Sequence, residues 1–244
     1  MINKVIKKLL GTARDSFLGC FWFSHDFIFY RKMLFKNKTK IGMRLFPQIF
    51  DHSPASHTFD KHYVYMDRWA FRQIQNSHPA EHVDVGSSIR FLSMASCVTQ
   101  LKFVDIRPVR LDFDNFECIE GSILKLPFAG NSVQSLSCLH VAEHIGLGRY
   151  GDPLDPKGTE KACQELQRVL APGGVLYFAV PIGEEITYFN AHRVFNPKTI
   201  LDYFGGLQLQ GFSAVSDQGH FISNANWQDF TGAHYACGMF KFTK

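Results

Sequence analysis

From residue 81 onwards, short apolar runs alternate with segments of helical length. The apolar runs predict strands at 82–85, 101–106, 116–119, 134–141 and 174–181. Buried strands that alternate with helical segments are typical of βαβ units, whose strands form a mostly parallel sheet. The pattern therefore predicts an α/β fold.

The C-terminal third of the chain predicts two helices and a pair of strands. Apolar side chains recur at helical spacing in 157–171. A second helix is expected over 197–204, because Asn196 can cap it and a proline occupies its first position. The segments 207–217 and 234–244 read as two strands separated by a loop. Such a pair predicts an antiparallel edge on the parallel sheet.

Length and composition favour a single globular domain with an extension. The chain has 244 residues, of which 45% are hydrophobic and 20% charged, enough to form a hydrophobic core. We expect a basic, aromatic extension or lid over 1–75 and an α/β domain over 76–244. None of the six cysteines forms a C-x-x-C pair, which is typical of a protein in a reducing compartment, so a cytoplasmic location is expected.

Positive charge is concentrated at the N-terminus. Residues 1–44 contain ten Lys and Arg against Asp15 and Asp26, a net charge of +8, whereas the remainder of the chain is net −4. The aromatic run 16–30 is interrupted by His25 and Asp26, so neither a signal peptide nor a membrane span is expected. Two interpretations remain: a helix packed on the domain, or peripheral contact between residues 1–44 and an anionic membrane.

Residues 1–44 form the N-terminal arm. Two further segments lie between this arm and the first strand. Residues 46–62 are rich in Pro, His and Ser and predict an irregular connection. Residues 61–71 place several aromatic side chains, including Tyr63 and Trp69, just before the first strand. This aromatic segment is either a lid over a bound cofactor or part of the hydrophobic core.

The candidate chemistry begins where the first predicted strand ends. A tight turn follows there, with Asp84, Gly86, Ser87 and Ser88, and Asp105 ends the next strand. In nucleotide-binding α/β folds, a turn of this kind admits the ligand and an acid about 20 residues later binds ribose hydroxyls. The spacing predicts such a site, although Gly86 alone would also fit a simple turn.

Three segments, 120–145, 165–181 and 191–204, carry a family resemblance. With the DVG turn, they resemble the class I S-adenosylmethionine-dependent methyltransferases. The motifs DVGSSIRFLS, LHVAEHIGLGRYGDPLDP and NAHRVFNP resemble more narrowly a largely uncharacterised family of bacterial methyltransferase-like proteins, some of whose members sit among surface-polysaccharide genes. The resemblance implies a Rossmann-like fold with a mostly parallel seven-stranded sheet, an antiparallel edge and helices on both faces.

The resemblance also implies roles for individual residues with S-adenosylmethionine as the cofactor. Asp84, Gly86, Ser87 and Ser88 would surround the methionine moiety, Asp105 would bind the ribose with Ile106 beside it, Ser122 and Ile123 would flank the adenine, and Leu139 and His140 would lie under the sulfonium.

The sequence departs from the family pattern at three positions. Ser88 and Arg90 stand where the family has glycines, and Ser122 stands where it has an acid. Arg90 fits only if it points away from the cofactor. Ser122 retains hydrogen-bonding capacity but carries no charge.

Polar side chains follow the fourth predicted strand, where an acceptor would meet the methyl group. His140, Glu143 and His144 share one face if the chain turns helical there. We predict no metal at this pair of histidines, because a third ligand is not obvious. His144 is the first candidate for a general base and His140 the second, followed by Asp152 in the next loop and His192. Structural support of the loop is the alternative role.

The sequence thus predicts a methyltransferase that uses S-adenosylmethionine, with a sugar oxygen or a surface-glycan precursor as acceptor. A catalytically inactive binding protein with the same fold is one alternative. A nucleic-acid methyltransferase is another, in which residues 1–44 would bind phosphates. It is disfavoured because no N/D-P-P-Y/F motif is present, so no nucleic-acid partner is expected. The sequence does not specify the oligomeric state.

Overall fold

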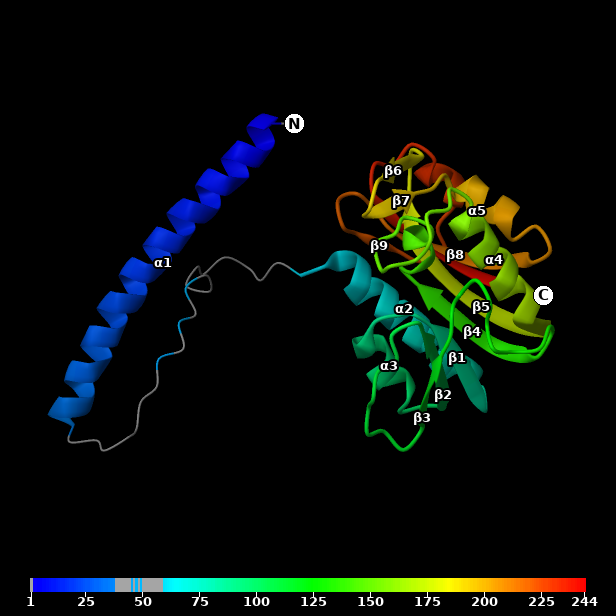
Figure 1. The fold of residues 1–244 in the computed structure, drawn as a ribbon, viewed down its shortest axis with the longest axis horizontal. Helices are drawn as coiled ribbons and strands as arrows, with labels where there is room; N and C mark the ends of the chain where they lie inside the picture. The colour runs from blue at the N-terminus through cyan, green and yellow to red at the C-terminus, as the bar shows by residue number, and fades with distance from the viewer. Residues whose placement is uncertain (1, 38–44, 46, 48, 50–58) are drawn as a thin grey trace. The chain divides into compact units, whose positions relative to one another are not determined.

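The computed structural model describes residues 2–37, 45, 47, 49 and 59–244 (Figure 1). Contacts divide the chain into two compact units, Met1–Thr58 and Phe59–Lys244. The first contains helix α1, Ile2–Lys36. No helix in the described part of the chain is both long and apolar enough to cross a membrane. The irregular connection predicted over 46–62 falls mainly outside the described residues.

The second unit is built on a sheet with the strand order β3-β2-β1-β4-β5-β10-β8-β9. Its parallel part consists of β1 (Glu81–Val85), β2 (Gln100–Asp105), β3 (Phe116–Glu120), β4 (Val133–Leu139) and β5 (Leu170–Ile182). The antiparallel part consists of β10 (Ala236–Thr243), β8 (Gln208–Val215) and β9 (Phe221–Ile222). The predicted mostly parallel sheet with an antiparallel edge is confirmed. It has eight strands instead of seven because the two-residue β9 pairs with β8.

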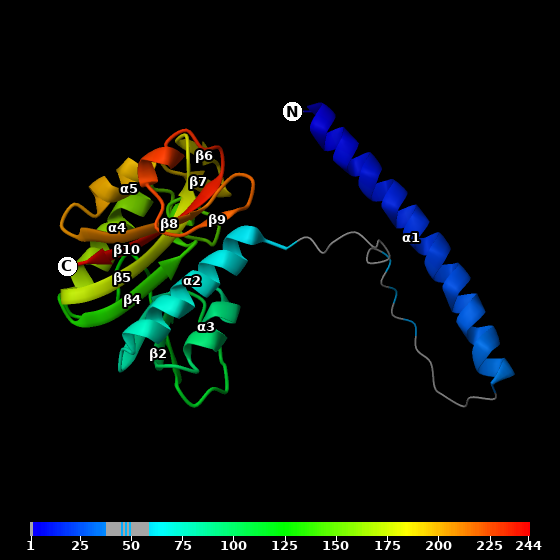
Figure 2. The same cartoon turned by 180° about the vertical axis from the view of Figure 1, so that it is seen from behind.

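Helices cover both faces of this sheet (Figures 1 and 2). Helices α2 (Lys61–Ser77) and α3 (Ile89–Ala95) pack on one face, and α4 (Gly158–Val169) and α5 (Pro197–Tyr203) pack on the other. The short 3-10 helices η1 (Ala142–His144) and η2 (Trp227–Phe230) and a small hairpin of β6 (Ile186–Tyr188) and β7 (His192–Val194) complete the unit. The predicted Rossmann-like α/β fold, with helices on both faces of a mostly parallel sheet, is confirmed.

Helix α2 packs with the sheet because it carries a buried apolar stripe. Asp60 caps its start by accepting a hydrogen bond from the Tyr63 amide at 3.2 Å. Met66, Ala70 and Ile74, four residues apart, are all fully buried. The contacts therefore place α2 with the domain, whereas the sequence analysis grouped residues 1–75 together. Tyr65 and Trp69 of the predicted aromatic segment also join this core cluster.

The topology creates a crevice where the strand order reverses. Strand β1 lies between β2 and β4. The chain runs outward from β1 through β2 to β3 and then crosses back to β4 on the other side of β1. In open α/β sheets, ligands bind outside the carboxyl ends of the strands at this point.

Candidate functional site

A cleft of about 390 Å³ opens at the carboxyl ends of β1, β2 and β4. Every predicted site residue except Asp84 and His192 lines it. The predicted residues on its wall are Gly86, Ser87, Ser88, Asp105, Ile106, Ser122, Ile123, Leu139, His140, His144 and Asp152. Tyr63, from the predicted aromatic segment, also lines the cleft. The fold thus brings together residues from several separate segments of the chain.

The turn after β1 requires glycine. Gly86 has a φ of +72°, in the left-handed region that disfavours side chains. A Cβ atom at this position would lie 2.9 Å from Cγ1 of Val141, which follows β4. The absence of a side chain therefore lets the β1 turn approach the end of β4 and leaves its backbone open to the cleft.

Asp84 supports this turn from below. It is fully buried, and its carboxylate accepts hydrogen bonds from the Ser87 amide at 3.0 Å and the Ser87 hydroxyl at 2.7 Å. The Ser137 hydroxyl donates to the same carboxylate. Burial raises the pKa of Asp84 to about 7, although the hydrogen bonds from Ser137 and Ser87 lower it. Asp84 does not line the cleft, so its expected contact with a methionine moiety is replaced by a structural role.

A buried histidine extends the network beneath the turn. His82 Nε2 is 2.8 Å from the Ser137 hydroxyl and its Nδ1 is 2.7 Å from the Ser135 hydroxyl. Since Ser137 donates its proton to Asp84, His82 Nε2 is the donor to Ser137 and Nδ1 the acceptor from Ser135. Burial lowers the pKa of His82 to about 3, so the ring is neutral. The sequence analysis did not single out His82.

Ser87 and Ser88 follow Gly86, and Ser88 stands where the family has a glycine. Ser87 Oγ accepts a hydrogen bond from the Leu139 amide at 3.1 Å and so ties β1 to β4. Ser88 caps α3 by accepting from the Phe91 amide, and it donates to Asp67 at 3.0 Å. Serine in place of a family glycine is therefore accommodated. The side chain of Arg90 is exposed and does not line the cleft. An arginine at this family glycine position is therefore compatible with a cofactor in the cleft.

Asp105 ends β2 on the opposite wall. Its Oδ1 accepts a hydrogen bond from the Arg107 amide at 2.7 Å, and no described residue donates to Oδ2. Apolar side chains, including Ile106 and Ile123, lie near it along the cleft. Ser122 Oγ accepts from the Leu124 amide at 3.2 Å, which leaves its hydroxyl proton available. A carboxylate oxygen beside an apolar wall suits a ligand with both hydroxyls and a flat ring.

His140, directly after β4, has a strained backbone. Its φ of +55° is unusual for a residue with a side chain and costs about 1–3 kcal/mol, a strain found most often at functional sites. Its Nδ1 is 2.6 Å from Oε1 of Glu143, and both side chains are buried. Burial lowers the pKa of His140, but Cys237 and Glu143 outweigh it and raise the pKa well above its usual value. Burial likewise raises the pKa of Glu143, but His140 lowers it overall.

His144 is arranged to accept a proton. Its Nδ1 lies 2.6 Å from the Ala191 carbonyl oxygen and must donate to it, since a carbonyl only accepts. This fixes the tautomer and leaves a lone pair on Nε2. The side chain is 13% exposed and lines the cleft. Its geometry therefore fits the predicted base.

The loop after η1 is held by Asp152, which the sequence analysis named as a candidate base, and by Arg193. Asp152 accepts from the Gly146 amide at 2.6 Å and from the Tyr150 amide at 3.3 Å, so both carboxylate oxygens serve the loop. Arg193 is buried and donates to the Ile145 carbonyl at 2.6 Å. Asp152 thus lines the cleft but acts as a support for its wall.

Tyr150 connects this loop to the opposite wall of the cleft. The Arg107 guanidinium lies 4.5 Å from the centroid of the Tyr150 ring, within the range of a cation–π contact. Both side chains line the cleft. The contact bridges the chain after β2 and the loop after η1.

A second, polar cavity of about 280 Å³ adjoins the same histidines. Its walls consist of Asp60, His62, Tyr63, His140, Glu143, His144, Arg149, Tyr150, His192 and Tyr235. His192 therefore lines this cavity instead of the cleft, with its ring 5.2 Å from that of Tyr235. Burial lowers the pKa of His192. The sequence analysis missed Asp60, His62 and Tyr235, which carry no local motif.

Sequence comparison identifies one family. A family model described as "Caenorhabditis protein of unknown function, DUF268" matches residues 102–234. No curated protein sequence matches the chain. The bacterial relatives expected from the sequence motifs stay a prediction.

Structural comparison finds the same fold in several solved proteins. The N-methyltransferase NodS from Bradyrhizobium japonicum, bound to S-adenosyl-L-homocysteine, has a TM-score of 0.50 and 13% identity, with 80% of this chain and 90% of NodS covered. A proposed sarcosine dimethylglycine methyltransferase from Galdieria sulphuraria has a TM-score of 0.52 and 15% identity, with 74% and 86% covered. The [4+2]-cyclase SpnF has a TM-score of 0.53 and 12% identity, with 73% and 81% covered. These likenesses show the fold.

Proposed function

The chain belongs to the family described as Caenorhabditis protein of unknown function, DUF268, and we propose that it is an S-adenosylmethionine-dependent methyltransferase. We propose further that it methylates an oxygen of a sugar or a glycan precursor. One observation carries the proposal. The cleft at the reversal of strand order is lined by the residues that the family resemblance assigns to the cofactor, apart from Asp84.

The walls of the cleft fit S-adenosylmethionine. The open backbone at Gly86, which a Cβ atom would close against Val141, suits the amino acid end of the cofactor. The free carboxylate oxygen of Asp105 suits the ribose hydroxyls, and apolar Ile106 and Ile123 suit the adenine ring. When bound, the cofactor supplies a methyl group activated by a positively charged sulfur.

The polar cavity supports a hydroxylated acceptor. Each of its side chains can form hydrogen bonds, and several of its rings offer flat surfaces. For a hydroxyl acceptor, the oxygen gains the methyl group as the carbon–sulfur bond breaks, and its proton must be removed. Nε2 of His144 can take this proton because Nδ1 is already held by Ala191. The remaining contribution of the protein is to align the acceptor with the methyl group.

Calorimetry with S-adenosylmethionine and S-adenosyl-L-homocysteine tests the cofactor assignment. We expect both to bind the full chain and Asp105→Ala to weaken binding by about 1.5–3 kcal/mol, the range for hydrogen bonds to charged groups. This corresponds to a roughly 10- to 150-fold rise in Kd. The matched control is Asp112→Ala, an exposed acid of the following loop that does not line the cleft. No binding to the folded protein, or equal affinity of Asp105→Ala and wild type, would contradict the assignment.

The reaction itself needs a separate measurement, because the same fold also occurs in a cyclase. Transfer of a labelled methyl group should be followed with nucleotide sugars, lipid-linked glycan precursors and RNA as acceptors. We expect label in a sugar fraction. Label in RNA would instead support a nucleic-acid methyltransferase, and cofactor binding without any transfer would support an inactive binding protein.

A further inference from the structure

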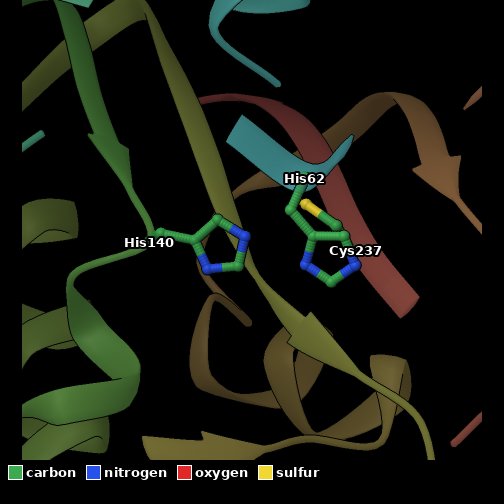
Figure 3. Close-up of side chains that lie close together, drawn as sticks. All are labelled: His62, His140 and Cys237. Atoms are coloured by element: carbon green, nitrogen blue, oxygen red, sulfur yellow. The ribbon is translucent and has the colours of Figure 1, made fainter. Parts of the chain in front are cut away.

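Three side chains that could bind a metal converge beside the polar cavity. They are His62 at the start of α2, His140 after β4 and Cys237 in β10. Their ligand atoms all lie within 4.8 Å of one another. Figure 3 shows the His140 ring facing the His62 ring and the Cys237 sulfur. His140 and Cys237 are buried, His62 is partly buried, and Cys237 is a free thiol.

His140 has the arrangement of a metal-binding histidine. Its Nδ1 is held by Glu143 at 2.6 Å, while its Nε2 is buried and has no hydrogen-bond partner among the described residues. Such an atom is costly in a protein interior, because buried polar groups are normally paired. In metalloproteins, a ligating histidine usually donates its other ring N–H to a carboxylate, which orients the ring. Glu143 supplies that carboxylate here, and a metal would satisfy Nε2.

We propose that His62, His140 and Cys237 bind a single Zn²⁺ ion, with the fourth position open to the polar cavity. Two imidazoles and a thiolate suit a borderline-soft cation such as Zn²⁺ and not Mg²⁺ or Ca²⁺, which prefer oxygen. Three protein ligands with an open position are typical of reactive zinc sites. Both histidines line the polar cavity, which gives the ion a route of entry.

Binding requires only a modest contraction of the cluster. Zn–S distances of about 2.3 Å and Zn–N distances of about 2.0–2.1 Å place tetrahedral ligand atoms roughly 3.3–3.6 Å apart. The separations in the cluster, all within 4.8 Å, must therefore shrink by at most about 1.2–1.5 Å. His62 can supply this movement because it is only partly buried and lies at the start of a helix.

The position of the ion bears on the acceptor. His140 lines both the cleft and the polar cavity, so an ion that it holds would lie near both the expected cofactor and the expected acceptor. An acceptor hydroxyl bound there would lose its proton more readily. This placement rests on the proposed function, whereas the binding of Zn²⁺ does not.

Cobalt titration tests the site without reference to activity. The full chain, stripped with a chelator and kept reduced, is titrated with Co²⁺ in the absence of S-adenosylmethionine. We expect one equivalent to bind with the visible absorption of tetrahedral Co²⁺ and a thiolate-to-cobalt charge-transfer band, and Zn²⁺ to displace it. Absence of a saturable one-equivalent spectrum would overturn the proposal.

Variants identify the ligands. Cys237→Ser should remove the charge-transfer band, and His62→Gln should keep it but weaken binding at least tenfold. Glu143→Gln, which removes the carboxylate that orients His140, should weaken binding roughly 10- to 100-fold with the band retained. The matched control is Cys97→Ser, an exposed cysteine outside the cluster, which should bind as wild type.

Folding of each variant is checked by circular dichroism. If Cys237→Ser does not fold, His62→Gln decides, because its side chain is partly exposed. Wild-type affinity in folded His62→Gln, or a band that persists in Cys237→Ser and disappears in Cys97→Ser, would overturn the assignment. Because no cofactor is present, a negative result leaves the methyltransferase proposal standing. Binding of Co²⁺ without any binding of S-adenosylmethionine would support the metal site and contradict the methyltransferase proposal.

Discussion

Replacing Gly86 by alanine should destabilise the domain through two separable effects. The φ of +72° costs a residue with a Cβ atom about 1–2 kcal/mol. The new Cβ would also lie 2.9 Å from Val141 Cγ1, well inside the roughly 3.5–4.0 Å at which carbon atoms pack. Overpacking of this kind costs about 1–3 kcal/mol. We therefore expect a loss of about 2–5 kcal/mol in the free energy of unfolding.

Two further variants separate these effects. Gly173 has nearly the same φ, +74°, but a Cβ atom there would meet no atom within 4 Å. Gly173→Ala should therefore show the conformational cost alone, about 1–2 kcal/mol. Adding Val141→Ala to Gly86→Ala removes the clash and should bring the remaining cost close to that of Gly173→Ala. Val141→Ala alone completes the double-mutant cycle.

Urea unfolding followed by circular dichroism measures each free energy by linear extrapolation. Affinity for S-adenosylmethionine should also fall in Gly86→Ala, since the displaced turn forms part of the cleft. The reasoning fails if Gly86→Ala is no more destabilising than Gly173→Ala. It also fails if removal of the Val141 methyl groups brings no recovery.

Three other predictions follow from the site and the arm. His144→Gln should lower turnover about 10²- to 10⁴-fold and leave cofactor affinity unchanged, measured with an identified acceptor from pH 6 to 9. Near-normal turnover would show that His144 is not the base and would leave Asp152 or His192 as the candidate. The lowered pKa of His82, about 3, means that the folded state resists its protonation, so stability is lost as pH falls from about 6.5 toward 3. His82→Gln should reduce that loss by up to about 1.4 kcal/mol per pH unit, measured by urea unfolding at several pH values, and an unchanged pH dependence would contradict this. We expect vesicles with anionic lipid to bind the chain in a salt-sensitive manner that is lost without residues 1–44; equal binding to neutral vesicles would count against it.

The N-terminal arm combines positive charge with exposed aromatic side chains on α1. Large aromatic side chains such as Phe17, Phe21 and Phe35 are 71–89% exposed on this helix. Together with the basic residues they form the combination that binds at membrane interfaces.

Local patterns explain why much of the fold was predictable. The strands of the main sheet other than β9, and the helices α4 and α5, carry their own apolar pattern, and α5 also has the capping residue Asn196, so each is recognisable without its neighbours. The cleft follows from topology, because parallel strands bring their carboxyl ends to one edge. The role of each side chain at that edge depends on hydrogen-bond partners from other strands and loops. Asp84 illustrates this, since its register partner on β4, Ser137, supplies the hydrogen bond that holds the carboxylate beneath the turn.

The metal-binding cluster lay beyond sequence analysis for the same reason. His62, His140 and Cys237 come from three distant segments, and none lies near another member of the cluster in the sequence. The sequence did draw attention to the pair His140 and His144, which lie close together in the chain. The structure gives the two rings different partners at Nδ1, because Glu143 holds His140 while the Ala191 carbonyl holds His144. Nε2 of His144 also lies 3.8 Å from Oε1 of Glu143.

This difference in partners assigns different chemistry to the two histidines. Nε2 of His140 is buried and faces His62 and Cys237, so an acceptor in the cleft has no access to it. Nε2 of His144 keeps its lone pair on a side chain that reaches both cavities. The strained backbone of His140 is then understandable, because the left-handed φ turns the chain from β4 into η1 and places the two rings on different tasks. On our proposals, His140 holds the metal ion and His144 takes the proton.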